Sequence, residues 1–158
     1  MHSKKVMNRK KGFTLIEVLV VIGIIAVLAA IVLVAVNPAR QFKLARDSQR
    51  VSNVNALLNA IHQNMAEHRG LFLCNGAPKA IPLAATVVQS APSGGPGDIA
   101  SCLVPDYISA LPYDPSLAGA HYTSAADYDS GYEIAQDANG RITASSTGEL
   151  VPSISVTR

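Results

Sequence analysis

The sequence predicts an α+β protein in which a long N-terminal helix packs, through its second half, on a small antiparallel sheet. Two observations support this fold class. Residues 13–36 form an almost uninterrupted apolar run, and the chain after residue 70 holds only short apolar segments between turn residues such as Asn139-Gly140. The long run is typical of a membrane-spanning helix, and the short segments are typical of strands. We therefore expect the first half of the helix to cross a membrane and the chain to kink near Pro38.

The apolar run at 13–36 is expected to be a transmembrane helix. At 1.5 Å per residue it extends about 36 Å, more than the roughly 30 Å hydrocarbon core of a bilayer. It is also longer than the apolar core of a cleaved signal peptide, which has about 7 to 15 residues. Five basic residues precede it: Lys4, Lys5, Arg9, Lys10 and Lys11. Such a cluster keeps the N-terminus in the cytoplasm, so the residues after Val36 should face outward.

A second helical segment is expected to follow the break at Asn37-Pro38. Asn37 is a suitable N-cap, and proline is tolerated at the first position of a helix. Gly70 is placed to end this segment after about His68. One face carries apolar residues at spacings of three and four: Val51, Val54, Leu58, Ile61 and Met65. This stripe needs a cover, which the sheet in the C-terminal half should provide.

The C-terminal half should supply that sheet. Residues 132–134 and 141–144, on either side of Asp137-Ala138-Asn139-Gly140, predict a hairpin because Asn-Gly is a strong turn signal. The stretch 74–97 is rich in Ala, Pro, Gly and Ser, which predicts a loop with one short strand near 81–88. The segment Leu111-Pro112-Tyr113-Asp114-Pro115 predicts a rigid turn.

Basic residues gather at the start of the second helical segment: Arg40, Lys43, Arg46 and Arg50. Asp47 lies four residues after Lys43 and is expected to pair with it. The cluster either faces solvent and lipid headgroups or contacts the acidic head of a neighbouring chain. Nucleic-acid binding is not expected, because no aromatic side chains alternate with these cations.

Small residues in the membrane segment, Gly23, Ala26 and Ala30, permit close packing of helices, although ordinary membrane composition explains them equally well.

Composition argues against an enzyme. Without the five leader cations, eight Lys and Arg stand against eleven Asp and Glu, so the net charge is near −3 and gives no sign of nucleic-acid binding. The sequence contains no visible catalytic triad, phosphate-binding loop or metalloprotease motif. No nucleophile stands beside any of the four histidines, His2, His62, His68 and His121. We expect a structural protein without catalytic residues.

The two cysteines, Cys74 and Cys102, both fall on the predicted outward side of the membrane, where disulfides persist. A disulfide between them is the favoured interpretation, and two free buried thiols are the alternative. A metal site at these cysteines is not expected, since no other Cys or His lies at zinc-ligand spacing.

The hexapeptide Gly12-Phe13-Thr14-Leu15-Ile16-Glu17, after a short basic leader and before an apolar helix, resembles the N-terminal signature of type IV prepilins and type II secretion pseudopilins. The resemblance implies that a prepilin peptidase cleaves between Gly12 and Phe13 and methylates the new amino group of Phe13. It also implies that Glu17, the fifth residue of the mature chain, is the glutamate that directs assembly. The Pro-Tyr-Asp-Pro turn at 112–115 is similar to an element of many pseudopilins.

Glu17 is the single charged residue of the apolar run, and its position requires a physical explanation. A carboxylate inside a transmembrane helix costs on the order of a few kcal/mol unless it is paired or near the interface. The amino group of Phe13 on a neighbouring subunit lies at the same membrane depth and is a suitable partner. The alternative is that Glu17 reaches the lipid headgroups and has no role in assembly.

Acidic and amide side chains surround the predicted hairpin: Asp127, Asp129, Asp137 and Asn139. Oxygen ligands on loops suit calcium, which major pseudopilins similar to this chain often bind in that region. The spacing fits no defined calcium motif, so solvated turn residues are the preferred interpretation. We expect no cofactor, and calcium is the one ion that the sequence leaves open.

These inferences divide the chain into a cleaved leader (1–12), a transmembrane and polymerisation helix (13–36), an outer helix segment (37–69) and a globular head (70–158). The resemblance implies a structural subunit of a type IV pilus-like filament. Its partners would be other copies of itself, prepilin peptidase, membrane lipid, and the pilus assembly platform with its ATPase. The precursor would lie in the cytoplasmic membrane and the assembled filament outside it. The alternatives are a pseudopilin of a secretion or DNA-uptake system and an uncleaved single-pass binding protein.

Overall fold

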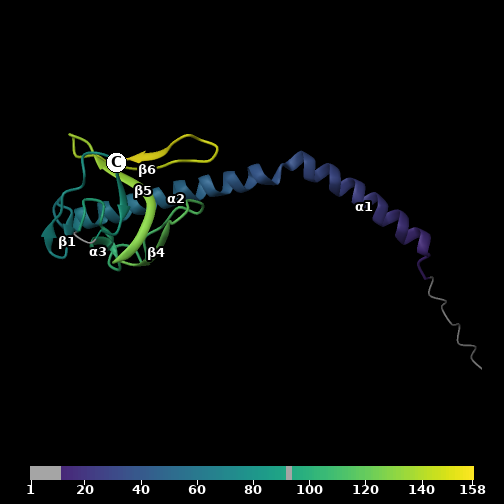
Figure 1. The fold of residues 1–158 in the computed structure, drawn as a ribbon, viewed down its shortest axis with the longest axis horizontal. Helices are drawn as coiled ribbons and strands as arrows, with labels where there is room; N and C mark the ends of the chain where they lie inside the picture. The colour runs from purple at the N-terminus through teal and green to yellow at the C-terminus, as the bar shows by residue number, and fades with distance from the viewer. Residues whose placement is uncertain (1–11, 92–93) are drawn as a thin grey trace, which may run out of the picture. The chain divides into compact units, whose positions relative to one another are not determined.

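The computed structural model describes residues 12–91 and 94–158. The predicted leader therefore lies outside the described residues, except for Gly12. The described chain forms two compact units, one ending at Gln41 and the other running from Phe42 to Arg158. Two long helices come first along the chain, and the strands follow with a short third helix among them (Figure 1). This arrangement confirms the predicted α+β class, with a long apolar helix followed by a small antiparallel sheet.

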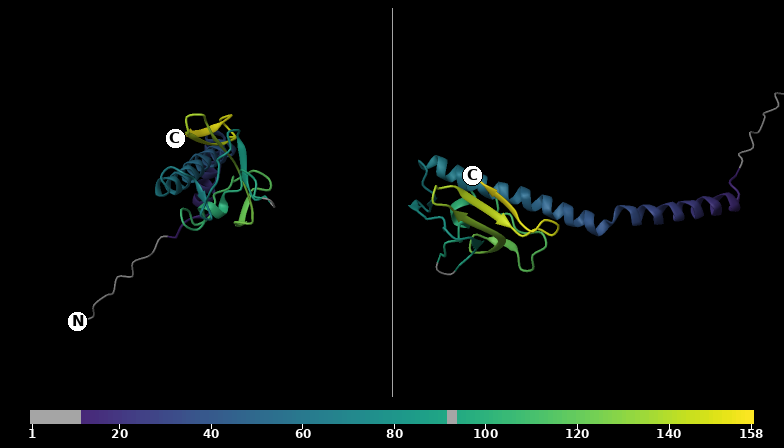
Figure 2. Two further views of the ribbon diagram at one scale, coloured as in Figure 1. Left: turned by 90° about the vertical axis from the view of Figure 1, so that its left-hand side faces the viewer. Right: turned by 90° about the horizontal axis from the view of Figure 1, so that it is seen from above.

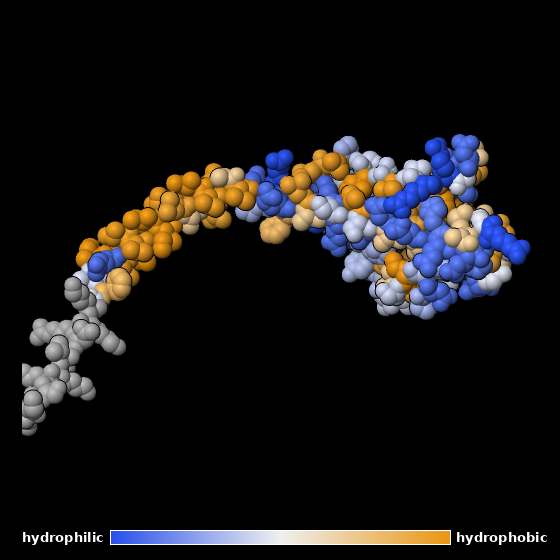
Figure 3. Space-filling view, turned by 180° about the vertical axis from the view of Figure 1, so that it is seen from behind, coloured by the Kyte–Doolittle hydropathy of each residue, from blue (hydrophilic) through white to orange (hydrophobic). Residues whose placement is uncertain are grey.

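The first helix, α1 (Leu15–Val36), is apolar along its whole length. It contains 22 residues, none of which is buried. Figure 3 shows hydrophobic residues over the visible face of this helix, with polar residues at its N-terminal end. The helix is long and apolar enough to cross a membrane, as the sequence predicts.

The second helix, α2 (Pro38–Glu67), begins directly after a break at Asn37. Asn37 adopts a left-handed backbone conformation, with a φ of 46°, and so ends α1. Its side-chain oxygen accepts a hydrogen bond from the N–H of Arg40 at 3.2 Å, which caps α2. Pro38 occupies the first helical position, where its missing donor costs nothing. The predicted break at Asn37-Pro38 is therefore confirmed.

The end of α2 also follows the prediction from Gly70. The helix stops at Glu67, and Gly70 has a φ of 89°, a conformation that favours glycine. The N–H of Gly70 donates to the carbonyl of Met65 at 2.8 Å, which satisfies one of the last helical acceptors.

Among its described residues, the head contains two antiparallel sheets and one short helix. A small hairpin pairs β1 (Leu73–Cys74) with β2 (Ala77–Pro78). The larger sheet has the order β3-β5-β6-β7, and β4 pairs with β5. Its strands are β3 (Thr86–Gln89), β4 (His121–Ser124), β5 (Asp127–Gln136), β6 (Ile142–Ser146) and β7 (Ile154–Thr157), and the helix is α3 (Ala100–Leu103). Figure 2 shows the sheet lying along α2.

One face of α2 and one face of the sheet enclose the core. Tyr128, Tyr132 and Ile134 alternate along β5 and are almost fully buried, as the two-residue period of a strand requires. They share a hydrophobic cluster with the buried face of α2: Val54, Leu57, Leu58 and Ile61. The predicted cover for the apolar stripe of α2 is therefore the sheet.

Val51 departs from that stripe, because its side chain is 44% exposed. The sheet does not cover α2 at this level. Arg50 and Asp47 instead turn toward polar loops of the head, and Val51 is left on the flank of the helix. Leu57, which is not among the residues of the predicted apolar stripe, is buried.

The hairpin prediction at Asn139-Gly140 is confirmed. Gln136 and Ile142 face each other at the end of the β5–β6 ladder, and Gly140 has a positive φ of 81°. The strand expected near 81–88 is shorter and later, at 86–89. Pro82, which cannot donate to a ladder, lies in the irregular part. A second Asn-Gly turn, Asn75-Gly76, joins β1 to β2 with two positive φ angles, inside a stretch predicted as loop.

Candidate functional site

The predicted cleavage site lies just before the start of α1. Gly12, Phe13 and Thr14 are outside the helix and exposed, and the Phe13 side chain is 87% exposed. A peptide bond outside regular structure can enter a peptidase site without unwinding a helix first. The structure therefore leaves the Gly12–Phe13 bond accessible.

Thr14 and Glu17 form a capping box at the start of α1. The Thr14 hydroxyl accepts the N–H of Glu17 at 3.3 Å, and the Glu17 carboxylate accepts the N–H of Thr14 at 2.9 Å. The Thr14 hydroxyl also lies 2.8 Å from the same carboxylate oxygen. Glu17 thus satisfies donors at the helix N-terminus, where a negative charge is also favoured by the helix dipole.

The capping box adds a third explanation for Glu17, beside pairing with a neighbour and reaching the headgroups. The signal was present in the sequence as a Thr followed three residues later by a Glu. Both bonds from Thr14 go to Oε2 of Glu17, and within the described residues no bond reaches Oε1. The local cap and a bond from another subunit's amino group are therefore compatible.

The basic start of α2 is joined to the head by a network of charged side chains. Arg50 forms a two-point ion pair with Asp114, at 2.7 and 3.0 Å, and a third bond to Asp47 at 2.7 Å. Arg46 forms a two-point pair with Glu149 at 2.5 and 2.6 Å. Arg50 and Asp114 are only 3% and 5% exposed. We call these five residues the charge network.

The pairing predicted for Asp47 was wrong. Asp47 does not pair with Lys43, because its carboxylate accepts the backbone N–H groups of Glu149 at 2.8 Å and Leu150 at 2.9 Å. Arg46 and Arg50, for which the sequence left two alternatives open, bind acids of their own head. Residues more than sixty positions away in the sequence therefore replace the i,i+4 partner that the local pattern favours. Arg40 and Lys43 have no ion pair among the described residues.

The charge network lowers the pKa values of its acids. Hydrogen bonds from the backbone of Glu149 and Leu150 lower the pKa of Asp47 to about 2. The Arg46 guanidinium lowers the pKa of Glu149 to about 2. Burial raises the pKa of Asp114, but the bond from Arg50 and two backbone N–H groups outweigh it and hold the pKa below its usual value. Asp114, chiefly, raises the pKa of Arg50. All of these groups are charged at neutral pH.

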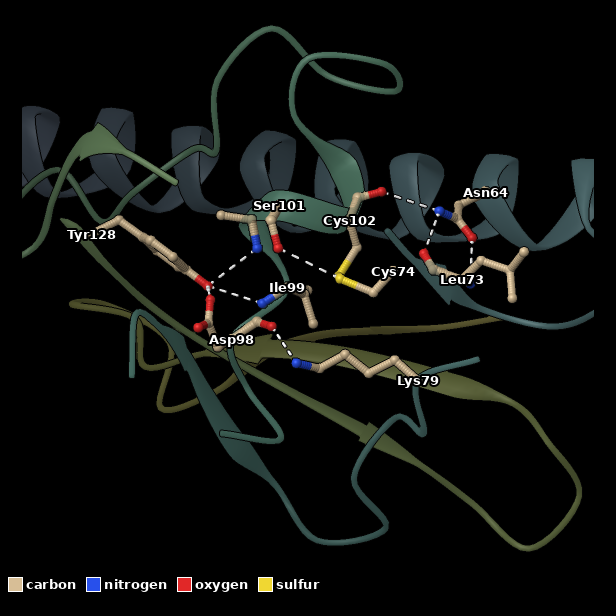
Figure 4. Close-up of a disulfide and its surroundings, with 10 residues drawn as sticks. Asn64, Leu73, Cys74, Lys79, Asp98, Ile99, Ser101, Cys102 and Tyr128 are labelled. Atoms are coloured by element: carbon tan, nitrogen blue, oxygen red, sulfur yellow. Dashed lines mark hydrogen bonds between the residues drawn. A yellow bond between two sulfur atoms is a disulfide. The ribbon is translucent and has the colours of Figure 1, made fainter. Parts of the chain in front are cut away.

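Cys74 and Cys102 form a disulfide, as the sequence predicts. The bridge links β1 to α3, and Figure 4 shows Asn64 of α2 beside it. The Asn64 amide donates to the carbonyls of Leu73 at 2.9 Å and Cys102 at 3.1 Å, and its oxygen accepts the N–H of Leu73 at 2.9 Å. The disulfide and this buried amide together fasten the far end of the head to α2.

The side chains considered for calcium do not gather at one place. Asp127 and Asp129 lie at the start of β5, whereas Asp137 follows its end. Eight residues of extended chain separate Asp129 from Asp137, a distance of roughly 26 Å. Asp137 pairs with Arg141 at 2.7 Å, and Asp127 lies 3.1 Å from His121. The four oxygen ligands suggested by the sequence cannot surround a single ion.

Comparison with known proteins identifies the N-terminal segment. Residues 7–33 match the model of the prokaryotic N-terminal methylation motif. The chain is also 38% identical over 78 residues to "Prepilin peptidase-dependent protein D" of Escherichia coli (strain K12). That match covers 48% of this chain and about half, 51%, of the relative. No solved structure matches the chain.

The chain therefore carries a prepilin-type N-terminal methylation motif at the start of an exposed apolar helix. The motif and the relative support a protein of the type IV pilin and pseudopilin class. The relative is named for its dependence on prepilin peptidase.

Proposed function

We propose that this protein is a structural subunit of a type IV pilus-like filament, processed by prepilin peptidase and polymerised through its N-terminal helix. The observation that carries the proposal is the methylation motif at residues 7–33, placed where a leader meets an apolar helix. A folded head with a disulfide follows that helix, which suits a protein whose C-terminal part lies outside the cytoplasm.

The exposure of α1 supports the proposed polymerisation. All of its residues are exposed, so the helix needs a cover in every environment. Lipid covers it in the membrane, and outside the membrane the same helix from other copies provides an apolar surface. Contacts that join unlike surfaces of identical subunits, and that do not close into a ring, build a helical filament.

Processing prepares the subunit for assembly. Cleavage between Gly12 and Phe13 creates a new amino group, which is methylated and lies four residues before Glu17. The Oε1 atom of Glu17 accepts a hydrogen bond from this amine of a neighbouring subunit. The Oε2 atom keeps its hydrogen bonds from Thr14. The pairing lowers the cost of the carboxylate in an apolar surrounding and draws the subunit out of the lipid. The assembly platform and its ATPase would drive that extraction.

The experiment is electron microscopy and intact-mass measurement of filaments sheared from the cell surface. Filaments whose subunit mass corresponds to a chain beginning at methylated Phe13 would support the proposal. An uncleaved mass without filaments would contradict it and favour a single-pass binding protein. Short filaments, with secretion or DNA uptake lost in a deletion strain, would favour the pseudopilin alternative over a surface pilus.

A further inference from the structure

The sequence contains two Asn-Gly pairs, and both lie in exposed turns of the head. Asn75-Gly76 joins β1 to β2, and Asn139-Gly140 lies between β5 and β6. An asparagine followed by glycine can react without an enzyme, because glycine has no Cβ to crowd its backbone nitrogen as that nitrogen approaches the asparagine side chain. All four residues are exposed, so water reaches both turns. The two turns differ in the hydrogen bonds that hold them.

The turn at Asn139 is held firmly. The N–H of Gly140 donates to the carbonyl of Asp137 at 3.0 Å. The carboxylate of Asp137 accepts the N–H groups of Asn139 and Arg141, both at 2.9 Å. Beyond the turn, four residue pairs join β5 to β6. The N–H of Gly140 is therefore occupied, and the ladder beside it keeps the turn closed.

The turn at Asn75 is held more weakly. Among the described residues, the N–H of Gly76 donates to no backbone carbonyl. The strands β1 and β2 contribute only two residues each, and a two-stranded hairpin is marginally stable by itself. A Cβ placed on Gly76 would meet nothing within 4 Å, so the space around this residue is open. The Gly76 nitrogen is therefore free, and the turn can open around it.

We propose that Asn75 is a site of spontaneous deamidation. The backbone nitrogen of Gly76 loses its proton to water and bonds to Cγ of Asn75. The side-chain nitrogen takes up a proton and leaves as ammonia, which closes a succinimide ring. Water then opens the ring. Breaking the new bond to Cγ gives aspartate, and breaking the original peptide bond gives isoaspartate. One water is consumed, one ammonia is released, and no group is oxidised or reduced.

The reaction loosens the hairpin beside the disulfide. Cys74 pairs with Ala77 directly across the turn, so the two-residue connection has no slack. Isoaspartate adds one carbon to the backbone of this turn, and both products add a negative charge. Asn75 lines a cleft of about 200 Å³ together with Asp106 and Cys102, so the new carboxylate faces a like charge there. The disulfide becomes easier for a reductant to reach. This inference concerns the folded head and does not depend on the proposed function.

The test follows both sites in the full-length protein, by peptide mapping with mass spectrometry during incubation at mildly alkaline pH. Breaking one hydrogen bond of ordinary net strength slows a reaction about fivefold, so Asn75 should deamidate at least about fivefold faster than Asn139. In the reduced and urea-unfolded chain, where neither turn persists, the two rates should converge. Equal rates in the folded protein, or a faster reaction at Asn139, would overturn the inference.

Two matched variants locate the reacting nitrogen. Gly76 and Gly140 have nearly the same positive φ, 80° and 81°, so Gly76→Ala and Gly140→Ala introduce the same methyl group and similar strain. Gly76→Ala should slow deamidation of Asn75 to the rate of Asn139 or below, whereas Gly140→Ala should leave the rate at Asn75 unchanged. An unchanged rate in Gly76→Ala would overturn the inference.

The consequence for the disulfide is measured on the reaction products. Molecules deamidated at Asn75 are separated from unmodified molecules by ion exchange, and both are treated with a dithiol reductant. The bond between Cys74 and Cys102 should be reduced faster in the deamidated molecules. Equal rates of reduction would overturn the proposed loosening of the hairpin.

Discussion

The ion pair between Arg50 and Asp114 gives the sharpest test of how the head is held to α2. Asp114→Ala removes two bonds to the Arg50 guanidinium, at 2.7 and 3.0 Å, from a site where both partners are nearly buried. It also removes the acceptor for the N–H groups of Ser116 and Leu117, both at 2.8 Å. Arg50 keeps Asp47 as a counter-ion, so its charge is not left wholly unpaired.

We expect Asp114→Ala to lower the free energy of unfolding by about 3 to 4 kcal/mol, near the lower end of the range for breaking a buried pair. For a domain of this size that corresponds to a fall in melting temperature of about 12 to 16 °C. The assay is thermal unfolding of the full chain in detergent, monitored by circular dichroism. Asp106→Ala, at an exposed acid, is the control and should change stability by less than about 0.5 kcal/mol. Equal melting temperatures for the two variants would refute the reasoning.

Three further predictions concern acid, the disulfide and the N-terminus. The folded pKa values of Asp47 and Glu149, each about 2, lie below their unfolded values, so their stabilisation is present above about pH 4.5 and is lost as the pH falls toward 2. Urea unfolding at pH 7 and pH 2.5 measures this, and equal stability at both would exclude it. Replacing Cys74 and Cys102 by Ser should lower stability by about 3 to 4 kcal/mol without altering processing, measured by the same unfolding assay and by intact mass. Glu17→Ala should be cleaved after Gly12 but fail to enter filaments, with Glu17→Asp intermediate; normal filaments from Glu17→Ala subunits expressed alone would show that the pairing is not required.

The sequence by itself determined the parts of this protein that depend on neighbouring residues. The apolar run predicted α1, and Asn37-Pro38 predicted the break between α1 and α2. Gly70 predicted the end of α2, and Asn139-Gly140 predicted a hairpin. With only two cysteines there was one intrachain pairing to consider. The capping box of Thr14 and Glu17 belongs to the same local class, because its partners are three residues apart. Signals of this kind lie within one helical turn or one tight turn and can be recognised without a structure.

Tertiary structure alone decided which distant residues meet. Arg50 and Asp114 are 64 residues apart in sequence, and Asp47 and Glu149 are 102 apart. No local rule predicts such partners, and local spacing instead favours Lys43 as the partner of Asp47 and a core position for Val51. Asp129 and Asp137 illustrate the opposite case, since these residues are close in sequence but are separated by the length of β5. A local rule describes the interactions that a residue can make within its own helix or turn. The packing of α2 against the sheet and loops decides which of the possible partners the residue contacts.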